Sequence, residues 1–206
     1  MEVADTNKNI SYYVADLSNS EAIKNVIQKI SVKFNSRIDI LVNSAGWCPV
    51  KSISEMTIKD YDMAFDIDVR GLVDITIHSL PLLKKAKGVI INLSSAGLHR
   101  KGPNLSMYLG AKAAIEAFTK VWALELASSE MRVNAITPGA IKTPIWTKAG
   151  LSDEEARNHE QATASSIPVK RMGNANEVAN VALFLASEEA SYVTGAIYSV
   201  DGGMSI

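Results

Sequence analysis

Residues 88–128, "GVIINLSSAGLHRKGPNLSMYLGAKAAIEAFTKVWALELAS", decide the fold class of this chain. Positions 88–95 form a nearly continuous apolar run, which is typical of a strand buried on both faces of a parallel sheet. Positions 107–128 predict a helix, because apolar residues recur along them at helical spacing. The apolar stripe of that helix consists of Ala114, Ile115, Phe118, Trp122 and Leu126.

The rest of the chain repeats this alternation of short β-branched runs and helical patterns. Strands are expected at 10–17, 38–46, 131–139 and 195–203, and helices at 18–34, 57–84 and 174–187. Strand–helix alternation of this kind indicates a doubly wound α/β fold, in which helices cover both faces of a parallel sheet in three layers. A single domain is expected over residues 1–206.

The stretch 144–172 breaks the alternation. It holds polar and helix-like pieces but no strand pattern. Long connections of this kind often close over a binding site, so we expect an insertion at one end of the sheet that acts as a substrate lid.

Composition narrows the range of partners. The 206 residues carry 21 basic and 22 acidic side chains, a formal net charge of −1, and no run of like charges. Neither nucleic acid nor a membrane surface is therefore an expected partner. The apolar runs are shorter than the roughly 20 residues of a membrane helix, and the first ten residues lack the apolar core of a signal peptide. A cytoplasmic location is the expectation.

Cysteine and histidine usage argues against a metal or disulfide framework. Cys48 is the only cysteine, which excludes a disulfide within the chain, and the thiol is expected to be buried and inert. The three histidines are scattered, so no metal site is predicted.

Ser95, Tyr108 and Lys112 form the constellation that carries chemistry. Tyr108 and Lys112 are four positions apart and share one face of the predicted helix. A cation about 4 Å away would lower the pKa of a phenol by roughly 1–3 units from its usual value near 10. Tyr108 is therefore expected to exchange protons near neutral pH, and Ser95 to hydrogen-bond the same substrate oxygen.

Such a site activates a carbon–oxygen bond but holds no electron carrier. A nicotinamide cofactor would supply the hydride. The rival interpretation of Ser95 as a nucleophile needs a G-x-S-x-G elbow and a later histidine. Here the serine lies in "NLSSAG", and no histidine stands in that relation.

Seven pieces of the sequence together resemble the short-chain dehydrogenase/reductase family, and they run over essentially the whole chain. They are "ADL" (15–17), "LVNSAG" (41–46), "INLSS" (91–95), the Tyr108/Lys112 pair, "RVNAITPGAIKTP" (132–144), "GNANEVANVALFLASEEASYVTG" (173–195) and "VDGG" (200–203). The resemblance is to the branch with 3-oxoacyl-thioester reductases and sugar dehydrogenases. It implies a Rossmann-like fold and NAD or NADP as cofactor.

The resemblance also implies roles for single residues. Ser95 would orient the substrate oxygen, Tyr108 would be the acid/base, and Lys112 would hold the nicotinamide ribose. Asp68 falls on the fourth catalytic position. Besides Tyr108 and Lys112, the cofactor contacts would be Asp16, Leu17, Asn43, Ser44, Ala45, Gly46, Pro138, Gly139, Ile141 and Thr143.

Two departures from the family pattern concern single residues. The family usually has a double asparagine before Ala-Gly, where this chain has Asn43-Ser44. The fourth catalytic position is normally asparagine, where this chain has Asp68. An ionised aspartate accepts hydrogen bonds but cannot donate them, so we expect an altered proton relay behind Lys112.

The third departure is the glycine-rich turn that cradles phosphate in this family. No T-G-x-x-x-G-x-G occurs in the 206 residues, and the N-terminal βαβ unit is expected to be missing. Three explanations stay open: a fragment of a longer protein, direct pairing of strands 10–17 and 38–46, or a second chain that fills the gap.

The sequence therefore predicts an NAD(P)-dependent oxidoreductase acting on a secondary alcohol or ketone, such as a sugar, a polyol or a 3-oxoacyl compound. The alternative is a catalytically inactive remnant that serves as an oligomer subunit or scaffold. A homodimer or homotetramer is expected, because the family pairs the helix at 107–128 across a two-fold axis.

Overall fold

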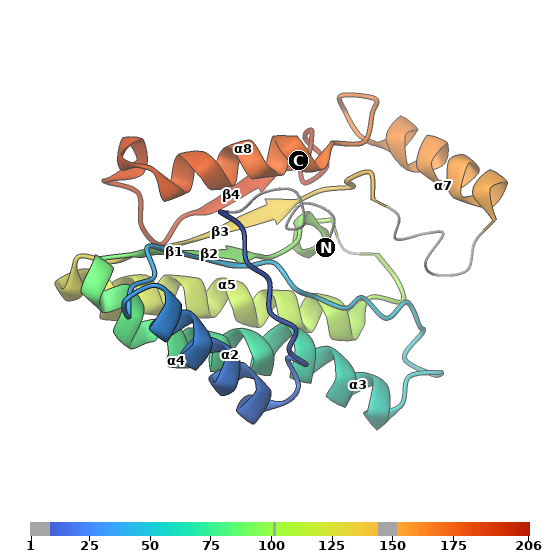
Figure 1. Ribbon diagram of the computed structural model, residues 1–206. Helices are drawn as coiled ribbons and strands as arrows, with labels where there is room; N and C mark the ends of the chain where they lie inside the picture. Colours follow the sequence, from blue (N-terminus) through green and yellow to red (C-terminus); the bar gives the residue numbers. More distant parts are fainter. Residues whose placement is uncertain (1–8, 101, 144–151) are drawn as a thin grey trace.

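A four-stranded parallel sheet lies at the centre of the computed structural model, which describes residues 9–100, 102–143 and 152–206 (Figure 1). The strands are β1 (Ile40–Asn43), β2 (Val89–Leu93), β3 (Arg132–Pro138) and β4 (Ile197–Val200), and they lie in that order across the sheet. Each pairs with its neighbour in parallel. The predicted Rossmann-like α/β class is confirmed.

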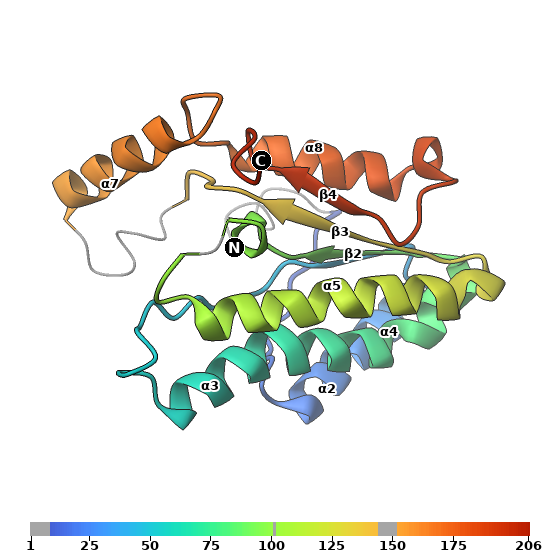
Figure 2. The same ribbon diagram turned by 180° about the vertical axis from the view of Figure 1, so that it is seen from behind.

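Helices cover both faces of the sheet, as the strand–helix alternation predicted. Helix α8 (Ala175–Ala186) lies on one face, and α2 (Ser20–Lys33), α4 (Gly71–Ala86) and α5 (Ser106–Leu126) lie on the other (Figures 1 and 2). Adjacent residues of β2 serve opposite cores: Ile90 packs on the α5 side and Ile91 on the α8 side, both fully buried. This two-sided burial explains why the strand reads as a nearly continuous apolar run.

The helix expected at 57–84 consists of three consecutive segments. Helix α3 (Ile58–Phe65) begins with a capping box between Thr57 and Asp60, a π-helical turn follows at Asp66–Arg70, and α4 continues to Ala86. Such π segments insert an extra residue into a helix and often occur at functional sites. Here the π turn carries the buried side chain of Asp68.

A buried amide network fixes β1 and β2 against the helices below them. Asn43 Nδ2 donates to Asn92 Oδ1 across the strand pair at 2.9 Å and to Thr76 Oγ1 of α4 at 3.2 Å. Asn92 Nδ2 in turn donates to Thr119 Oγ1 of α5 at 2.9 Å. Polar groups buried in a sheet must be paired in this way, and the pairing ties the strand register to the helix layer.

The predicted strand at 10–17 is wrong. These residues have no regular secondary structure; they alternate between half-buried and exposed positions but pair with no strand in the described part of the chain. Alternation with a period of two describes how the side chains of one segment are buried. A β-strand also needs a second strand to accept and donate its backbone hydrogen bonds. Direct pairing with β1 is therefore ruled out. β1 lies at the edge of the described sheet, with Ile40 and Val42 each 46% exposed.

The segment predicted as a lid is described only in part. Residues 144–151, with Trp146, lie outside the described residues. Helix α7 (Asp153–Ser166) follows and lies beyond the C-terminal ends of β3 and β4 (Figure 1). The lid role of 144–172 remains a prediction. Within the described ranges, no helix has the length and apolar character needed to cross a membrane.

Candidate active site

The structure brings Ser95, Tyr108 and Lys112 together at the C-terminal end of β2. Ser95 follows the strand in an extended conformation and caps a 3₁₀ turn, its Oγ accepting from Gly97 N at 3.1 Å. Tyr108 and Lys112 lie in the first turns of α5. The Ser95 side chain lies close enough to Tyr108 to lower the pKa of its hydroxyl. In open α/β sheets, ligands bind at this edge.

The ammonium of Lys112 is buried behind the tyrosine ring. Lys112 is 4% exposed, and its Nζ lies 5.5 Å from the centroid of the Tyr108 ring. The same atom donates to the carbonyl oxygen of Leu93 at 3.1 Å and lies 3.4 Å from Asp68 Oδ2. The lysine is thus held between the end of β2 and the π turn.

Asp68 is the buried counter-charge of this lysine. It is 1% exposed, and its Oδ1 accepts from Trp47 N at 2.6 Å. Its Oδ2 meets Lys112 as an ion pair but makes no hydrogen bond of good geometry among the described residues. Burial raises the pKa of Asp68, and the opposing effects of Lys112 and the Trp47 N–H do not cancel that rise.

The expected lowering of the Tyr108 pKa is wrong for this structure. Burial raises the pKa of Tyr108 above its ordinary value, the Ser95 hydrogen bond lowers it, and the charges of Cys48 and Asp68 raise it further. The main physical reason is burial, which disfavours the charged phenolate, and the charges of Cys48 and Asp68 act in the same direction.

The other predicted cofactor residues fall into three places. Gly46 packs against the charged pair, where an added Cβ would lie 3.2 Å from Lys112 Nζ and 3.3 Å from Asp68 Oδ2. Leu17, Asn43, Ser44 and Ala45 line a small pocket of about 80 Å³ at the end of β1, beside Gly71 and Leu72 of α4. Pro138, Gly139, Ile141 and Thr143 follow one another from the end of β3.

Not every residue in these places is open to a ligand. The Asn43 amide is buried and already donates two hydrogen bonds, whereas Ser44 and Ala45 are exposed. The Asp16 carboxylate is exposed and accepts from Ser18 N at 2.9 Å and Ser18 Oγ at 2.7 Å. These bonds lower the pKa of Asp16 and occupy its Oδ1 atom.

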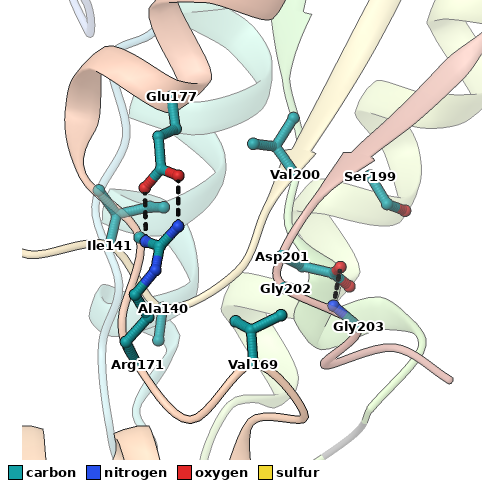
Figure 3. Close-up of a pocket in the computed structure, with 11 residues that line it drawn as sticks. Ala140, Ile141, Val169, Arg171, Glu177, Ser199, Val200, Asp201, Gly202 and Gly203 are labelled. Carbon is teal, nitrogen blue, oxygen red and sulfur yellow. Dashed lines mark hydrogen bonds and ion pairs between the residues drawn. The ribbon is translucent and has the colours of Figure 1, made fainter.

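The residues after β3 border a second pocket, of about 330 Å³ (Figure 3). Ile141 lines it, across from Val169 and beside the ion pair of Arg171 and Glu177. Gly139 needs its glycine, because an added Cβ would lie 2.7 Å from the Cα of Asp201. Thr143 is exposed and ends this described range.

A third pocket, of about 400 Å³, adjoins the turn that Ser95 caps. His99 and Arg100 line it together with Ser166 and the last four residues of the chain, 203–206. His99 follows directly after the 3₁₀ turn Ala96–Leu98.

Sequence reasoning missed the backbone groups and the network that support the site. The Trp47 N–H and the Leu93 carbonyl have no signature in side-chain patterns. Asn92 did carry a signal, since a lone amide within an apolar strand needs buried partners. Burial and the charge of Asp68 raise the pKa of the half-buried Cys48 thiol to about 11, which agrees with the predicted inert thiol.

The comparison with protein families covers almost the entire chain. The model for "Enoyl-(Acyl carrier protein) reductase" matches residues 2–205. The 3-oxoacyl-[acyl-carrier-protein] reductase FabG of Thermotoga maritima is 38% identical over 195 residues, which are 94% of this chain and 76% of that protein. Oxidoreductase UcpA of Escherichia coli K12 is 38% identical over 199 residues, 94% of this chain and 74% of that protein.

Three solved structures share the fold. Cj0485 dehydrogenase has a TM-score of 0.91 at 31% identity, over 99% of this chain and 78% of that one. The aldohexose dehydrogenase of Thermoplasma acidophilum has a TM-score of 0.91 at 29% identity, over 97% of this chain and 80% of that one. ElxO with NADP bound has a TM-score of 0.87 at 31% identity, over 96% of this chain and 79% of that one.

The parallel sheet with the serine, tyrosine and lysine at its C-terminal edge defines a nicotinamide-dependent type of oxidoreductase. This chain belongs to the short-chain dehydrogenase/reductase family. It spans about three quarters of the length of the relatives it matches. Members of the family use NAD or NADP.

The site fits one half of such a cofactor. Gly46 leaves room beside the Lys112 ammonium that a side chain would fill, the Asp68 Oδ2 atom still has capacity to accept a hydrogen bond, and Ser44 and Ala45 are open. These features suit a ribose and a nicotinamide. The 206 residues contain no glycine-rich turn of the family type for the phosphates.

Proposed function

We propose that this protein transfers a hydride between NAD or NADP and a secondary alcohol or ketone. The observation that carries the proposal is the convergence of the Ser95 and Tyr108 side chains at the end of β2, with the buried ammonium of Lys112 5.5 Å from the centroid of the tyrosine ring. A pair of hydroxyls at this edge can bind one substrate oxygen from two directions.

Protonation of Tyr108 sets the direction of proton transfer. Because burial raises the pKa of Tyr108, the resting side chain is a neutral phenol at neutral pH. It can therefore donate its proton to a carbonyl oxygen as negative charge develops there, while Ser95 donates a second hydrogen bond. The bound nicotinamide supplies or accepts the hydride. Lys112 would hold the ribose hydroxyls of the cofactor.

The relatives support a proposal for the substrate class. One relative is named a 3-oxoacyl-[acyl-carrier-protein] reductase and one structural neighbour an aldohexose dehydrogenase, so we propose a sugar, polyol or 3-oxoacyl compound for this chain. One structural neighbour is described with NADP bound, which supports a nicotinamide dinucleotide here. His99, which lines the third pocket, closely follows Ser95 in the sequence. This pocket would therefore hold the part of the substrate remote from the reacting carbon.

The test is the Tyr108→Phe variant, assayed with NADH and NADPH against acetoacetyl thioesters and aldohexoses. We expect a loss of turnover of at least about 10²-fold with an unchanged circular dichroism spectrum. Tyr192→Phe is the matched control, because Tyr192 is 103% exposed. Activity of Tyr108→Phe at the parent rate would refute the proposed acid/base role.

A non-catalytic scaffold is the second candidate function. The absence of T-G-x-x-x-G-x-G from the sequence favours it, as does the half-exposed edge of β1. Calorimetric titration of the 206-residue chain with NADH and NADPH separates the two candidates. Micromolar binding supports the enzyme, and binding weaker than millimolar supports the scaffold.

We propose, further, that the protein forms a homodimer or homotetramer in a cytoplasmic setting. The predicted stripe packs only partly within the subunit: Ile115 and Leu126 are buried, whereas Ala114, Phe118 and Trp122 are half-buried. The helix layer also exposes Ile77 by 60%, Val121 by 49% and Leu124 by 81%, which is apolar surface suited to a second copy. Light scattering at micromolar concentration tests the assembly, and a monomer would contradict it.

A further inference from the structure

The carboxylate of Asp68 stands in this chain at the position where the family normally has an asparagine amide. It reaches the site from the π turn between α3 and α4, and it is fixed by the Trp47 N–H at 2.6 Å. Its second oxygen lies 3.4 Å from the Lys112 ammonium, and both side chains are almost fully buried. A negative charge thus faces the lysine where the family places a neutral group.

We propose that Asp68 is a positioning residue that holds the Lys112 ammonium against the Leu93 carbonyl and neutralises the field of that ammonium at the Tyr108 hydroxyl. The inference rests on the proposed function only in that Tyr108 is taken as the acid/base. In this arrangement the lysine serves to hold a ligand, and the tyrosine stays protonated over a wider range of pH than with a neutral neighbour.

Charge and burial make the effect specific to an aspartate. At 3–4 Å, opposite charges with little water between them interact strongly, so a buried carboxylate can offset most of the field of one ammonium at a third group nearby. An asparagine of the same shape could still accept from the Trp47 N–H, but it would leave the ammonium uncompensated. The Tyr108 ring at 5.5 Å from Nζ would then sense the full positive charge.

The titratable groups around the site are few. Cys48 comes from the loop after β1, Asp68 from the π turn, and Tyr108 and Lys112 from α5. One turn further along α5, Glu116 is held by the Ser94 hydroxyl at 2.8 Å. On α3 and the π turn, Lys59 and Asp62 are exposed, Asp60 pairs with Lys51, and Asp66 pairs with Arg70.

The single cysteine and the tyrosine supply two readouts that need no substrate. Burial and then Asp68 raise the pKa of Cys48, while Lys112 lowers it, so the pH dependence of its alkylation reports the local charge. The Tyr108 hydroxyl can be titrated by NMR in protein labelled at the tyrosine ring carbon Cζ. Tyr108→Phe assigns its signal among the six tyrosines.

The experiment compares the parent with Asp68→Asn in the full chain. Removing the carboxylate charge should move both midpoints to lower pH, and iodoacetamide should alkylate Cys48 at pH 8.5 about threefold faster or more. The pH profile of alcohol oxidation should shift in the same direction. Asp66→Asn is the matched control, since it removes a half-exposed carboxylate from the same π turn and should move neither midpoint.

Unchanged titrations of Cys48 and Tyr108 in Asp68→Asn would overturn the inference. If that variant does not fold, Asp68→Ser keeps an acceptor for the Trp47 N–H and is read by the same two titrations. Failure of the proposed function can be distinguished from failure of this inference. A protein that turns over no substrate still gives titration curves for Cys48 and Tyr108, and these test the role of Asp68 by themselves.

Discussion

Asn43 and Asn92 face each other across β1 and β2, and their side-chain amides are hydrogen-bonded at 2.9 Å in the interior of the protein. Asn92 is fully buried, and its own amide continues to Thr119 of α5. The pair joins the edge strand of the described sheet to the central strand that carries Ser95. The position of the active-site serine thus depends on a buried polar network as well as on apolar packing.

Asn92→Ala is expected to lower the free energy of unfolding by about 2–4 kcal/mol, because it removes the buried side chain and takes one hydrogen-bond partner each from the Asn43 amide and the Thr119 hydroxyl. Urea unfolding followed by circular dichroism measures the change. Asn25→Ala on the exposed face of α2 is the control and should change stability by less than about 0.5 kcal/mol. Equal stability of the two variants would show that the network contributes nothing.

Gly46→Ala is expected to lower kcat/KM by about tenfold or more with little loss of stability. The added methyl group would lie 3.2 Å from Lys112 Nζ and 3.3 Å from Asp68 Oδ2 and would push the lysine from its position. Steady-state kinetics and thermal unfolding measure the two effects. Gly102→Ala serves as control, since its nearest neighbour would be Leu105 at 3.8 Å. A fully active Gly46→Ala protein would mean that this close approach is not required.

The pH dependence of turnover should differ between the two directions of the reaction. The pKa of Tyr108 is raised, so the phenol that donates a proton in reduction is fully present at neutral pH and is lost only when the pH rises through that high pKa. Oxidation needs the ionised form, and its rate should still be rising above pH 9. Initial rates in both directions between pH 6 and 10 test this. An oxidation rate already constant at pH 7 would contradict the raised pKa.

Glu177→Gln is expected to lower the melting temperature at neutral pH. The carboxylate accepts from Arg171 and from the N–H of Asn174 at the start of α8, and these contacts lower the pKa of Glu177 from 4.5 to about 2. A lowered pKa stabilises the fold above pH 4.5, and the contribution is lost as the pH falls through about 2. The difference in melting temperature between parent and variant should therefore shrink between pH 5 and 2. Glu125→Gln on the exposed face of α5 should show no such trend.

The sequence alone was sufficient for most of the fold. Nearly continuous apolar runs marked β1 and β2, and β2 carries no alternation because it is buried on both faces. Helical periodicity and caps located α2, α5 and α8 to within a residue or two. The spacing of Ser95, Tyr108 and Lys112 predicted their convergence, since a strand end and the first turns of the next helix meet at one edge of a parallel sheet.

Three features depended on the tertiary structure and could not be predicted from local sequence patterns: strand pairing, the π turn and the pKa of Tyr108. Residues 10–17 have the alternation of a strand but no described partner, and backbone pairing is a property of two segments rather than one. The π turn that aims Asp68 at Lys112 reads in sequence as ordinary helix. Burial raises the pKa of Tyr108, and Cys48 and a carboxylate forty residues away in the chain add to the rise, so the direction of the shift emerged only from the tertiary structure. Spacing along a helix determines which side chains can come into contact. The surrounding charges and the exclusion of solvent determine the pKa values of those side chains.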